Sequence, residues 1–273
     1  MGSARFIYHS KAMLKKDNNF PGIVIIGAGL SLDYCNIEID HFLAADYLFI
    51  LTDRIAVNFI RRYPDCKRVI ISVEPRSHNF LRPLKREIVW LWEHGNAANL
   101  VEEQNTVQLY SLKGVSGDTG FQHIRKYPGI PLLNLPSSGS VGGIAVALAI
   151  SMVLTMGKSM SSEIIFLGLD FSYPDLLAYS KMGVHSRDHD RLYTLETQHA
   201  EGVFARTSAL LSVNGNHIRT SHEFYEARQN LSALLTDTLN RYPGKFQFFD
   251  YSMPGILCEG VDRRVPAAMA LTD

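Results

Sequence analysis

The chain has 273 residues, 46% of them hydrophobic and 20% charged, and its 27 basic side chains balance 27 acidic ones. A nucleic-acid-binding protein usually carries a basic excess, so this composition argues against that class. The three cysteines, Cys35, Cys66 and Cys258, are odd in number and far apart. This spacing argues against a disulfide framework and a Cys-x-x-Cys metal site, and it predicts a reducing, cytoplasmic location.

The most apolar stretch, residues 141–156, is rich in glycine, alanine and serine. It is shorter than the about 20 residues that span a membrane, so we expect a helix buried against a sheet and no integral membrane segment. Residues 1–20 include the polar run Lys-Lys-Asp-Asn-Asn and lack the apolar core typical of a signal peptide. We therefore expect an N-terminal extension at residues 1–20.

Apolar runs alternate with helical segments along most of the chain. The pattern predicts strands at residues 22–26, 47–51, 68–73, 106–112, 132–135, 163–169 and 245–249. Helices are predicted at residues 32–43, 55–63, 81–94, 141–156 and 224–239. Continuous apolar strands between helices are typical of parallel strands covered on both faces. We therefore predict an α/β fold, a Rossmann-like, doubly wound and mostly parallel sheet with helices on both faces.

The alternation stops at residues 171–206, which are polar, rich in His, Asp, Ser and Tyr, and weakly periodic. Long segments of this kind in compact domains are usually functional, so we predict a lid-like excursion. A capping box, Thr220 with Glu223 three residues later, then opens the helix at residues 224–239. No linker divides the chain, so we predict a single domain at residues 21–260 and a C-terminal tail at residues 261–273.

A glycine-rich turn, Gly-Ala-Gly-Leu-Ser-Leu-Asp, directly follows the first predicted strand. Backbone N–H groups at such a strand-to-helix turn are unpaired, and the helix dipole favours an anion there. We predict that four residues of this turn bind a nucleotide: Gly27, Gly29, Ser31 and Asp33. Leu32 stands where a dinucleotide fingerprint has its third glycine, so a tight turn without a ligand is the alternative.

A second turn, rich in serine and glycine, precedes the long apolar helix at residues 141–156. Glycine in the first turn of a helix lowers its stability by about 0.8–1 kcal/mol per residue, and close approach of another group would offset that cost. A ligand phosphate and tight helix–sheet packing both satisfy this requirement. If a ligand phosphate is the group that approaches, five residues of the turn bind the nucleotide: Ser137, Ser138, Gly139, Ser140 and Gly142.

Three acidic residues, Asp53, Glu74 and Asp170, stand at or just after the carboxyl ends of predicted strands. Ligands of open α/β sheets bind at that edge, so all three are candidates for the site. The alternative is that each carboxylate caps a following helix or turn. Asp170 is the strongest functional candidate, because its strand directly follows the helix at residues 141–156.

Histidines gather in the predicted excursion. His185 and His189 have the spacing of metal ligands on a helix, but their segment has no helical pattern, so we expect a solvated loop and no metal site. A general base or a phosphate contact is a better-supported role for His185.

Several of these segments together resemble the motifs of a known family. Residues 27–33 are similar to the Gly-x-Gly-Pro-Ser-Leu motif of the MptE-like proteins, with Leu30 in place of the proline. Residues 137–141 and the strand ending Gly-Leu-Asp-Phe at Phe171 resemble the same family, as do residues 220–228 and 250–260. The family includes the Maf flagellin glycosyltransferases and archaeal 6-hydroxymethylpterin diphosphokinases, and Campylobacter-type bacterial sialyltransferases carry a similar motif.

The resemblance implies that residues 21–260 form a Rossmann-like nucleotide-binding transferase domain. In the sialyltransferase-like branch a CMP-activated sugar lies across the two turns, and a histidine deprotonates the acceptor hydroxyl. His185 comes soonest after the Gly-x-Asp strand, with His189 and His199 as alternatives, and Asp170 would share the catalytic site. The expected partners are therefore a nucleotide-sugar donor and a glycan or protein hydroxyl acceptor.

Two other functions stay open. In the pterin branch, ATP and Mg²⁺ replace the sugar nucleotide, a pterin is the acceptor, and an acidic residue such as Asp53 or Asp170 would hold the metal. The fold also suits a non-catalytic nucleotide-binding module, because Leu30 departs from the motif and the histidine is ambiguous.

Overall fold

The computed structural model describes most of the elements that the sequence predicts. The described residues are 20–72, 81, 84, 88–92, 108–113, 132–134, 140–156, 162–173, 180–183, 207–211, 217–253 and 260–270.

Among the described residues, nine strands form one sheet in the order β11-β10-β7-β1-β2-β3-β4-β5-β6, and every pairing between them is parallel. Its strands, in chain order, are β1 (Ile23–Ile26), β2 (Leu48–Thr52), β3 (Arg68–Ser72), β4 (Ile88–Trp92), β5 (Gln108–Lys113), β6 (Leu132–Asn134), β7 (Glu163–Leu167), β10 (Gln247–Asp250) and β11 (Asp262–Arg263). A separate antiparallel hairpin joins β8 (Thr207–Leu211) to β9 (His217–Ser221).

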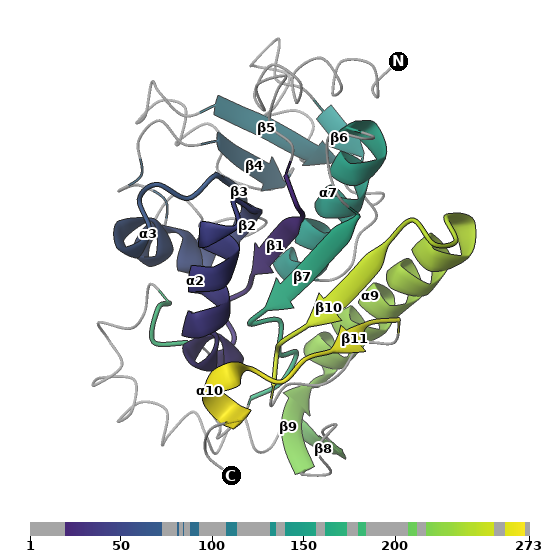
Figure 1. The fold of residues 1–273 in the computed structure, drawn as a ribbon. Coiled ribbons are helices and arrows are strands. Elements are labelled where there is room, and N and C mark those ends of the chain that lie inside the picture. The colour runs from purple at the N-terminus through teal and green to yellow at the C-terminus, as the bar shows by residue number, and fades with distance from the viewer. Residues whose placement is uncertain are drawn as a thin grey trace.

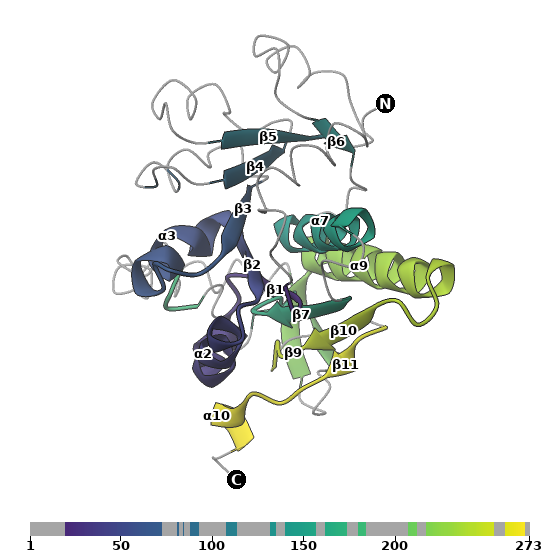
Figure 2. The same cartoon turned by 45° about the horizontal axis from the view of Figure 1, so that its top comes forward.

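Helices cover both faces of the sheet, as Figures 1 and 2 show. The helices in the described part of the chain are η1 (Leu30–Tyr34), α2 (Asn36–Ala44), α3 (Asp53–Arg62), α7 (Val141–Met156), α9 (His222–Arg241) and α10 (Ala267–Ala270), the last of which packs on α2 and η1. In Figure 2, α2 and α3 lie on one side of the strands, and α7 and α9 lie together on the other. The expected doubly wound α/β architecture is therefore confirmed.

Alternate residues of the central strands supply two separate cores. In β1, Ile23 and Ile25 join the core under α7 and α9, whereas Val24 and Ile26 join the core under α2 and α3. All four side chains are fully buried. This is why the strand reads as an unbroken apolar run: both faces of a parallel sheet are covered, so neither can be polar.

The chain changes direction across the sheet at β1. From β1 the strands β2 to β6 follow one another outward on one side, and the chain then returns through α7 to place β7 on the other side of β1. The carboxyl ends of β1 and β7 thus meet at a topological switch point, where open α/β sheets bind ligands. The turns after these two strands are residues 27–29 and 168–170.

Two local predictions are wrong. The helix predicted at residues 81–94 is contradicted by β4, which pairs with β3 and β5, and its Ile-Val-Trp-Leu-Trp sequence is β-branched and aromatic as strands favour. The cap of α9 is Ser221 instead of Thr220, because the Ser221 hydroxyl accepts from the Phe224 N–H at 3.2 Å. The Thr220 hydroxyl donates to the Phe171 carbonyl at 2.6 Å.

Of the predicted excursion at residues 171–206, only residues 171–173 and 180–183 are among the described ones. Within the described part of the chain, no helix has the length and apolar character needed to cross a membrane.

Candidate functional site

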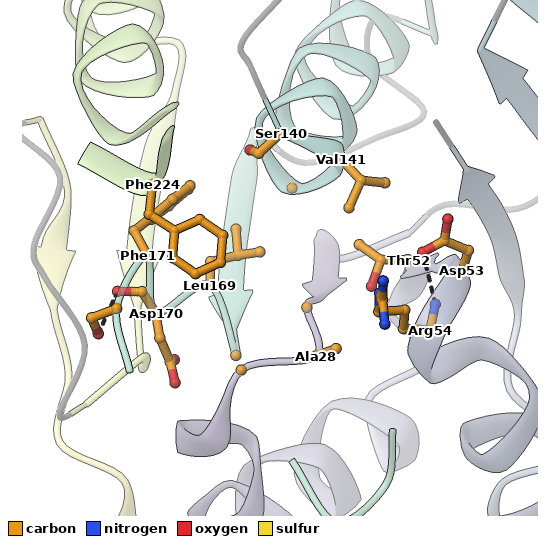
Figure 3. Close-up of a pocket in the computed structure, with 15 residues that line it drawn as sticks. Ala28, Thr52, Asp53, Arg54, Ser140, Val141, Leu169, Asp170, Phe171 and Phe224 are labelled. Carbon is orange, nitrogen blue, oxygen red and sulfur yellow. Dashed lines mark hydrogen bonds between the residues drawn. The ribbon is translucent and has the colours of Figure 1, made fainter. Parts of the chain in front are cut away.

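A pocket of about 290 Å³ opens at the carboxyl edge of the sheet, beside the switch point. Figure 3 shows its walls: the turns after β1 and β7, the start of α7, the start of α3, and Phe224 of α9. The lining residues are Gly27, Ala28, Gly29, Thr52, Asp53, Arg54, Ser140, Val141, Gly142, Gly168, Leu169, Asp170, Phe171, Ser172 and Phe224. Segments far apart in sequence therefore converge on one cavity near the size of small-molecule sites.

Three N–H groups, two from the turn after β1 and one from the start of η1, join this segment to the end of β7 and the turn that follows it. The Gly27 N–H donates to the Leu167 carbonyl at 2.8 Å, and the Gly29 N–H donates to the Gly168 carbonyl at 2.9 Å. The third, from Ser31, donates to Oδ2 of Asp170 at 3.0 Å. These alternate N–H groups continue the β1–β7 pairing beyond the sheet edge, so they are already paired within the protein. They are therefore not free donors for a phosphate in this arrangement.

Close packing explains the glycines of both turns. A Cβ on Gly27 would lie 2.2 Å from the Gly168 carbonyl oxygen, and one on Gly29 would lie 2.5 Å from Cγ of Asp170. A Cβ on Gly142 would meet Leu169 at 2.7 Å. All three distances are below ordinary van der Waals contact, so the two turns and the start of α7 approach as closely as they do because these residues lack side chains.

Asp170 lies at the centre of this junction. Its Oδ1 accepts from the Ser31 hydroxyl and its Oδ2 from the Ser31 N–H, so both carboxylate oxygens are bound to one residue. Only 3% of Asp170 is exposed, and Ser31 is fully buried. Burial raises the pKa of Asp170 to about 7, although the two hydrogen bonds from Ser31 act in the opposite direction.

A second buried carboxylate supports the turn after β7 from the neighbouring strand. Oδ1 of Asp250, at the end of β10, accepts from the Ser252 N–H at 2.8 Å. The Ser252 hydroxyl accepts from the Leu169 N–H at 2.8 Å. Burial raises the pKa of Asp250, and the hydrogen bonds from Ser252 and the charge of Arg263 oppose that rise. The turn at residues 168–170 is thus held from both sides.

The start of α7 brings a positive helix end to the pocket. Ser140 is its N-cap: the Ser140 hydroxyl accepts from the Gly143 N–H at 3.0 Å, and the Ser140 carbonyl accepts from the Ile144 N–H. Ser140, Val141 and Gly142 all line the cavity, and the first turn of the helix has no acidic residue. A 16-residue helix whose N-terminus faces a cavity favours an anion there.

The wall opposite Asp170 comes from β2 and α3. In Figure 3, Thr52, Asp53 and Arg54 lie together across the cavity from Asp170 and Phe171. Oδ2 of Asp53 accepts from the Ser72 hydroxyl at 2.6 Å, and its Oδ1 accepts from the Arg54 N–H at 2.8 Å. Asp53 is therefore bound on both oxygens, and Arg54 is the cationic side chain among the described lining residues.

An apolar wall completes the cavity. Leu169, Phe171 and Phe224 line it, and Phe224 comes from the first turn of α9. Phe171 has φ of 49°, a left-handed conformation that costs a bulky residue energy, and the hydrogen bond from Thr220 to its carbonyl helps to hold it. The cavity is thus polar and cationic on one side and aromatic on the other.

The structure brings together six of the residues predicted for the site: Gly27, Gly29, Asp53, Ser140, Gly142 and Asp170. Ser31 lies behind Asp170, and Asp33 faces away to accept from the Ser180 hydroxyl and the Lys181 N–H. The other candidates lie outside the described residues: Glu74, Ser137, Ser138, Gly139, His185, His189 and His199.

Sequence reasoning missed Thr52, Arg54 and the apolar wall. Thr52 and Arg54 flank Asp53 at the end of β2, so the rule that selected Asp53 would also have found them. Phe224 does not follow a predicted strand end, so its one signal was the resemblance of residues 220–228 to the family. The helix α9 follows β7 by more than fifty residues and reaches the site only through tertiary packing.

The carboxylates of the pocket do not fit a Mg²⁺ ion as they stand. Mg²⁺ requires several oxygen ligands in near-octahedral geometry, but Asp53 and Asp170 lie on opposite walls of the cavity (Figure 3) and are each held by hydrogen bonds to protein groups, so they do not converge on one ion. In Figure 3 the Asp170 carboxylate also extends away from Phe224 and Leu169. Among the described residues, no three His, Cys, Asp or Glu side chains come together in an arrangement that could hold a metal.

No family model matches the chain, and no curated protein matches it. Its fold is similar to that of a solved structure, the Maf glycosyltransferase from Magnetospirillum magneticum AMB-1, with a TM-score of 0.57 and 12% sequence identity. The likeness covers 93% of this chain and 34% of that chain, so this chain spans about a third of that protein's length. At this identity the likeness establishes the fold alone.

Proposed function

We propose that this chain is a glycosyltransferase of the Maf and MptE-like type that takes its sugar from a nucleotide donor. The observation that carries the proposal is the pocket at the switch point, where the N-terminus of α7 and Arg54 line the same cavity. The sequence motifs of that family and the fold of a Maf glycosyltransferase support the same reading. The donor we propose is a CMP-activated sugar of the sialic or nonulosonic acid type.

In this proposal the donor phosphate binds between the start of α7 and the Arg54 guanidinium. The bond from the anomeric carbon to the phosphate oxygen breaks, and the acceptor oxygen forms the new bond to that carbon. Negative charge then develops on the departing phosphate, where the helix N-terminus and Arg54 stabilise it. The proton of the acceptor hydroxyl passes to a base, for which we propose His185, with His189 and His199 as alternatives.

Calorimetric titration with CMP, CDP, UDP, GDP and ATP tests the binding step, the last with and without Mg²⁺. We expect CMP to bind most tightly, and Arg54→Gln to weaken its binding by about tenfold, because a charge-assisted contact to phosphate is lost. Arg61→Gln is the matched control, since Arg61 lies on the same helix, is exposed and does not line the pocket. It should bind CMP as the wild type does.

Other results would contradict the proposal. Preference for ATP with Mg²⁺, and release of AMP in the presence of hydroxymethylpterin, would favour the pyrophosphokinase function instead. Tight CMP binding without transfer from any CMP-sugar would favour a non-catalytic module. If Arg54→Gln and Arg61→Gln bind CMP equally tightly, Arg54 does not contact the donor phosphate.

The base is tested by replacing each histidine with alanine. His185→Ala should lower turnover by a factor of about 10²–10⁴, the usual contribution of a general base, while CMP affinity stays within about twofold. If turnover is unchanged in that variant but falls in His189→Ala or His199→Ala, the role belongs to that residue.

A further inference from the structure

We propose that Asp170 is a positioning residue, which fastens the turn after β1 to the turn after β7 through Ser31 and holds the two walls of the pocket in place. The inference rests on the proposed function for its activity readout. It assigns to Asp170 a task other than proton transfer, although the residue lies on the motif and the sheet edge where a catalytic carboxylate is expected.

The hydrogen bonds at the switch point form one continuous set. The Gly27 N–H donates to the carbonyl of Leu167 at the end of β7, and the Gly29 N–H donates to the carbonyl of Gly168. At Ser31 the N–H donates to a side chain instead of a backbone carbonyl. The side chain of Asp170 takes that place and accepts from both donors of Ser31. The carboxylate therefore continues the hydrogen-bond pattern between the two segments by one more residue, and it holds the first turn of η1 in place.

The space around Asp170 is shaped for this contact. Gly29 leaves the room that the carboxylate occupies, since a Cβ there would lie 2.5 Å from Cγ and 2.7 Å from Oδ2 of Asp170. Gly29, Ser31 and Asp170 thus form a single unit. Any side chain on Gly29 would push the carboxylate away from Ser31, so the second glycine of the Gly-x-Gly turn serves this junction directly.

The same geometry argues against a catalytic role. A pKa raised to about 7 would suit an acid–base catalyst, but both oxygens of Asp170 are engaged by Ser31 and the residue is 97% buried. The charged groups that act on its pKa are Asp250 from β10 and Asp33 from η1. Asp170 in turn helps to raise the pKa of the Cys35 thiol, for which burial is the main cause. None of these groups is a cation or lines the pocket. Asp170 itself lines the pocket, but its carboxylate extends away from Phe224 and Leu169 (Figure 3).

An amide can replace the carboxylate in this contact but not in proton transfer. In Asp170→Asn, the amide oxygen still accepts from the Ser31 N–H, and the amide nitrogen donates to the Ser31 hydroxyl oxygen. Asp170→Ala loses both bonds, and Ser31→Ala loses one. The asparagine variant therefore separates a positioning residue from a catalytic one.

The experiment measures turnover of a CMP-sugar, CMP affinity and the pH profile for the wild type and the variants Asp170→Asn, Asp170→Ala and Ser31→Ala. We expect Asp170→Ala and Ser31→Ala each to lower kcat/KM by tenfold or more, with the double variant no worse than Asp170→Ala alone. Asp170→Asn should restore activity to within about threefold of the wild type with an unchanged pH profile. The proposal is overturned if asparagine is as inactive as alanine while Ser31→Ala retains activity.

A ligand-free measurement keeps this inference separate from the proposed function. Amide hydrogen exchange of residues 27–34 should speed up at least tenfold in Asp170→Ala and stay near the wild-type rate in Asp170→Asn. If the wild type binds no nucleotide, the proposed function fails, but the exchange result still decides the positioning role. Equal exchange rates in the wild type and Asp170→Ala would overturn it.

Discussion

At the scale of single residues, the glycines and the buried carboxylate of the switch point depend on one another. Gly27 and Gly142 both sit where a side chain would collide, yet with different neighbours: a backbone carbonyl in the first case and the end of a leucine side chain in the second. A backbone group cannot move without disturbing the sheet, whereas Leu169 can adopt another rotamer. The two positions should therefore respond differently to the same substitution.

Gly27→Ala should lower the free energy of unfolding by at least the 1–3 kcal/mol typical of overpacking, because its Cβ would lie 2.2 Å from the Gly168 carbonyl oxygen. Gly142→Ala should stay within about 1 kcal/mol of the wild type, since the higher helix propensity of alanine offsets the displacement of Leu169. Urea unfolding of the two variants checks this. Equal destabilisation would contradict the packing shown here.

Asp170 also predicts a pH dependence of stability. Its pKa is about 7 in the folded protein and near 3.8 when unfolded, so between these values the folded state binds more protons. The contribution of Asp170 to the free energy of unfolding is therefore fully present below pH 4, and it is lost as the pH rises from there through 7. Asp170→Asn does not titrate, and Asp250 is present in both proteins.

The measurement is urea unfolding of the wild type and Asp170→Asn at pH 5 and pH 8. The wild type should lose stability relative to the variant on going to pH 8, by an amount on the order of a few kcal/mol. A constant difference between the two proteins across this range would show that the carboxyl does not titrate as described.

At the scale of elements, α7 has two tasks: it fills the core beneath the sheet and directs its N-terminus at the pocket. Ala145, Leu148 and Ala149 are fully buried, which explains why the helix is apolar on every side. Its cap, Ser140, belongs to both tasks, since it completes the helix and lines the cavity.

A pair of substitutions separates these tasks. Asparagine and aspartate cap helices about as well as serine, so Ser140→Asn and Ser140→Asp should unfold at similar urea concentrations. Aspartate, however, places a negative charge beside the proposed phosphate. We expect Ser140→Asp to weaken CMP binding at least tenfold relative to Ser140→Asn; equal affinities would mean that no anion binds at this helix end.

Strand β4 shows where an element-level prediction fails. Residues 81–94 combine apolar and basic positions at spacings that also suit a helix, and the sequence does not show that β3 leaves an open edge beside them. Pairing with β3 and β5 selects the strand over the residues from Ile88 to Trp92. Tertiary pairing thus overrides the local pattern.

At the scale of the whole molecule, the sequence predicted what depends on local pattern and missed what depends on assembly. Apolar runs located β1, β2, β3 and β7, and the strand-end rule found Asp53 and Asp170. The Gly-x-Gly turn was recognised, but its N–H groups donate to the neighbouring turn, which no local pattern reveals. Phe224 and the Ser31–Asp170 contact join segments more than fifty residues from their partners, so only the fold brings them together.

The position of a bound nucleotide decides whether the pocket at the switch point is the donor site. A crystal structure of the protein with CMP should place the phosphate between the N-terminus of α7 and Arg54, in the pocket at the carboxyl ends of β1 and β7. A second cavity of about 330 Å³ lies at the opposite edge of the sheet, beside Tyr63, Cys66 and Lys67. Nucleotide density there, with none at the switch point, would contradict the account.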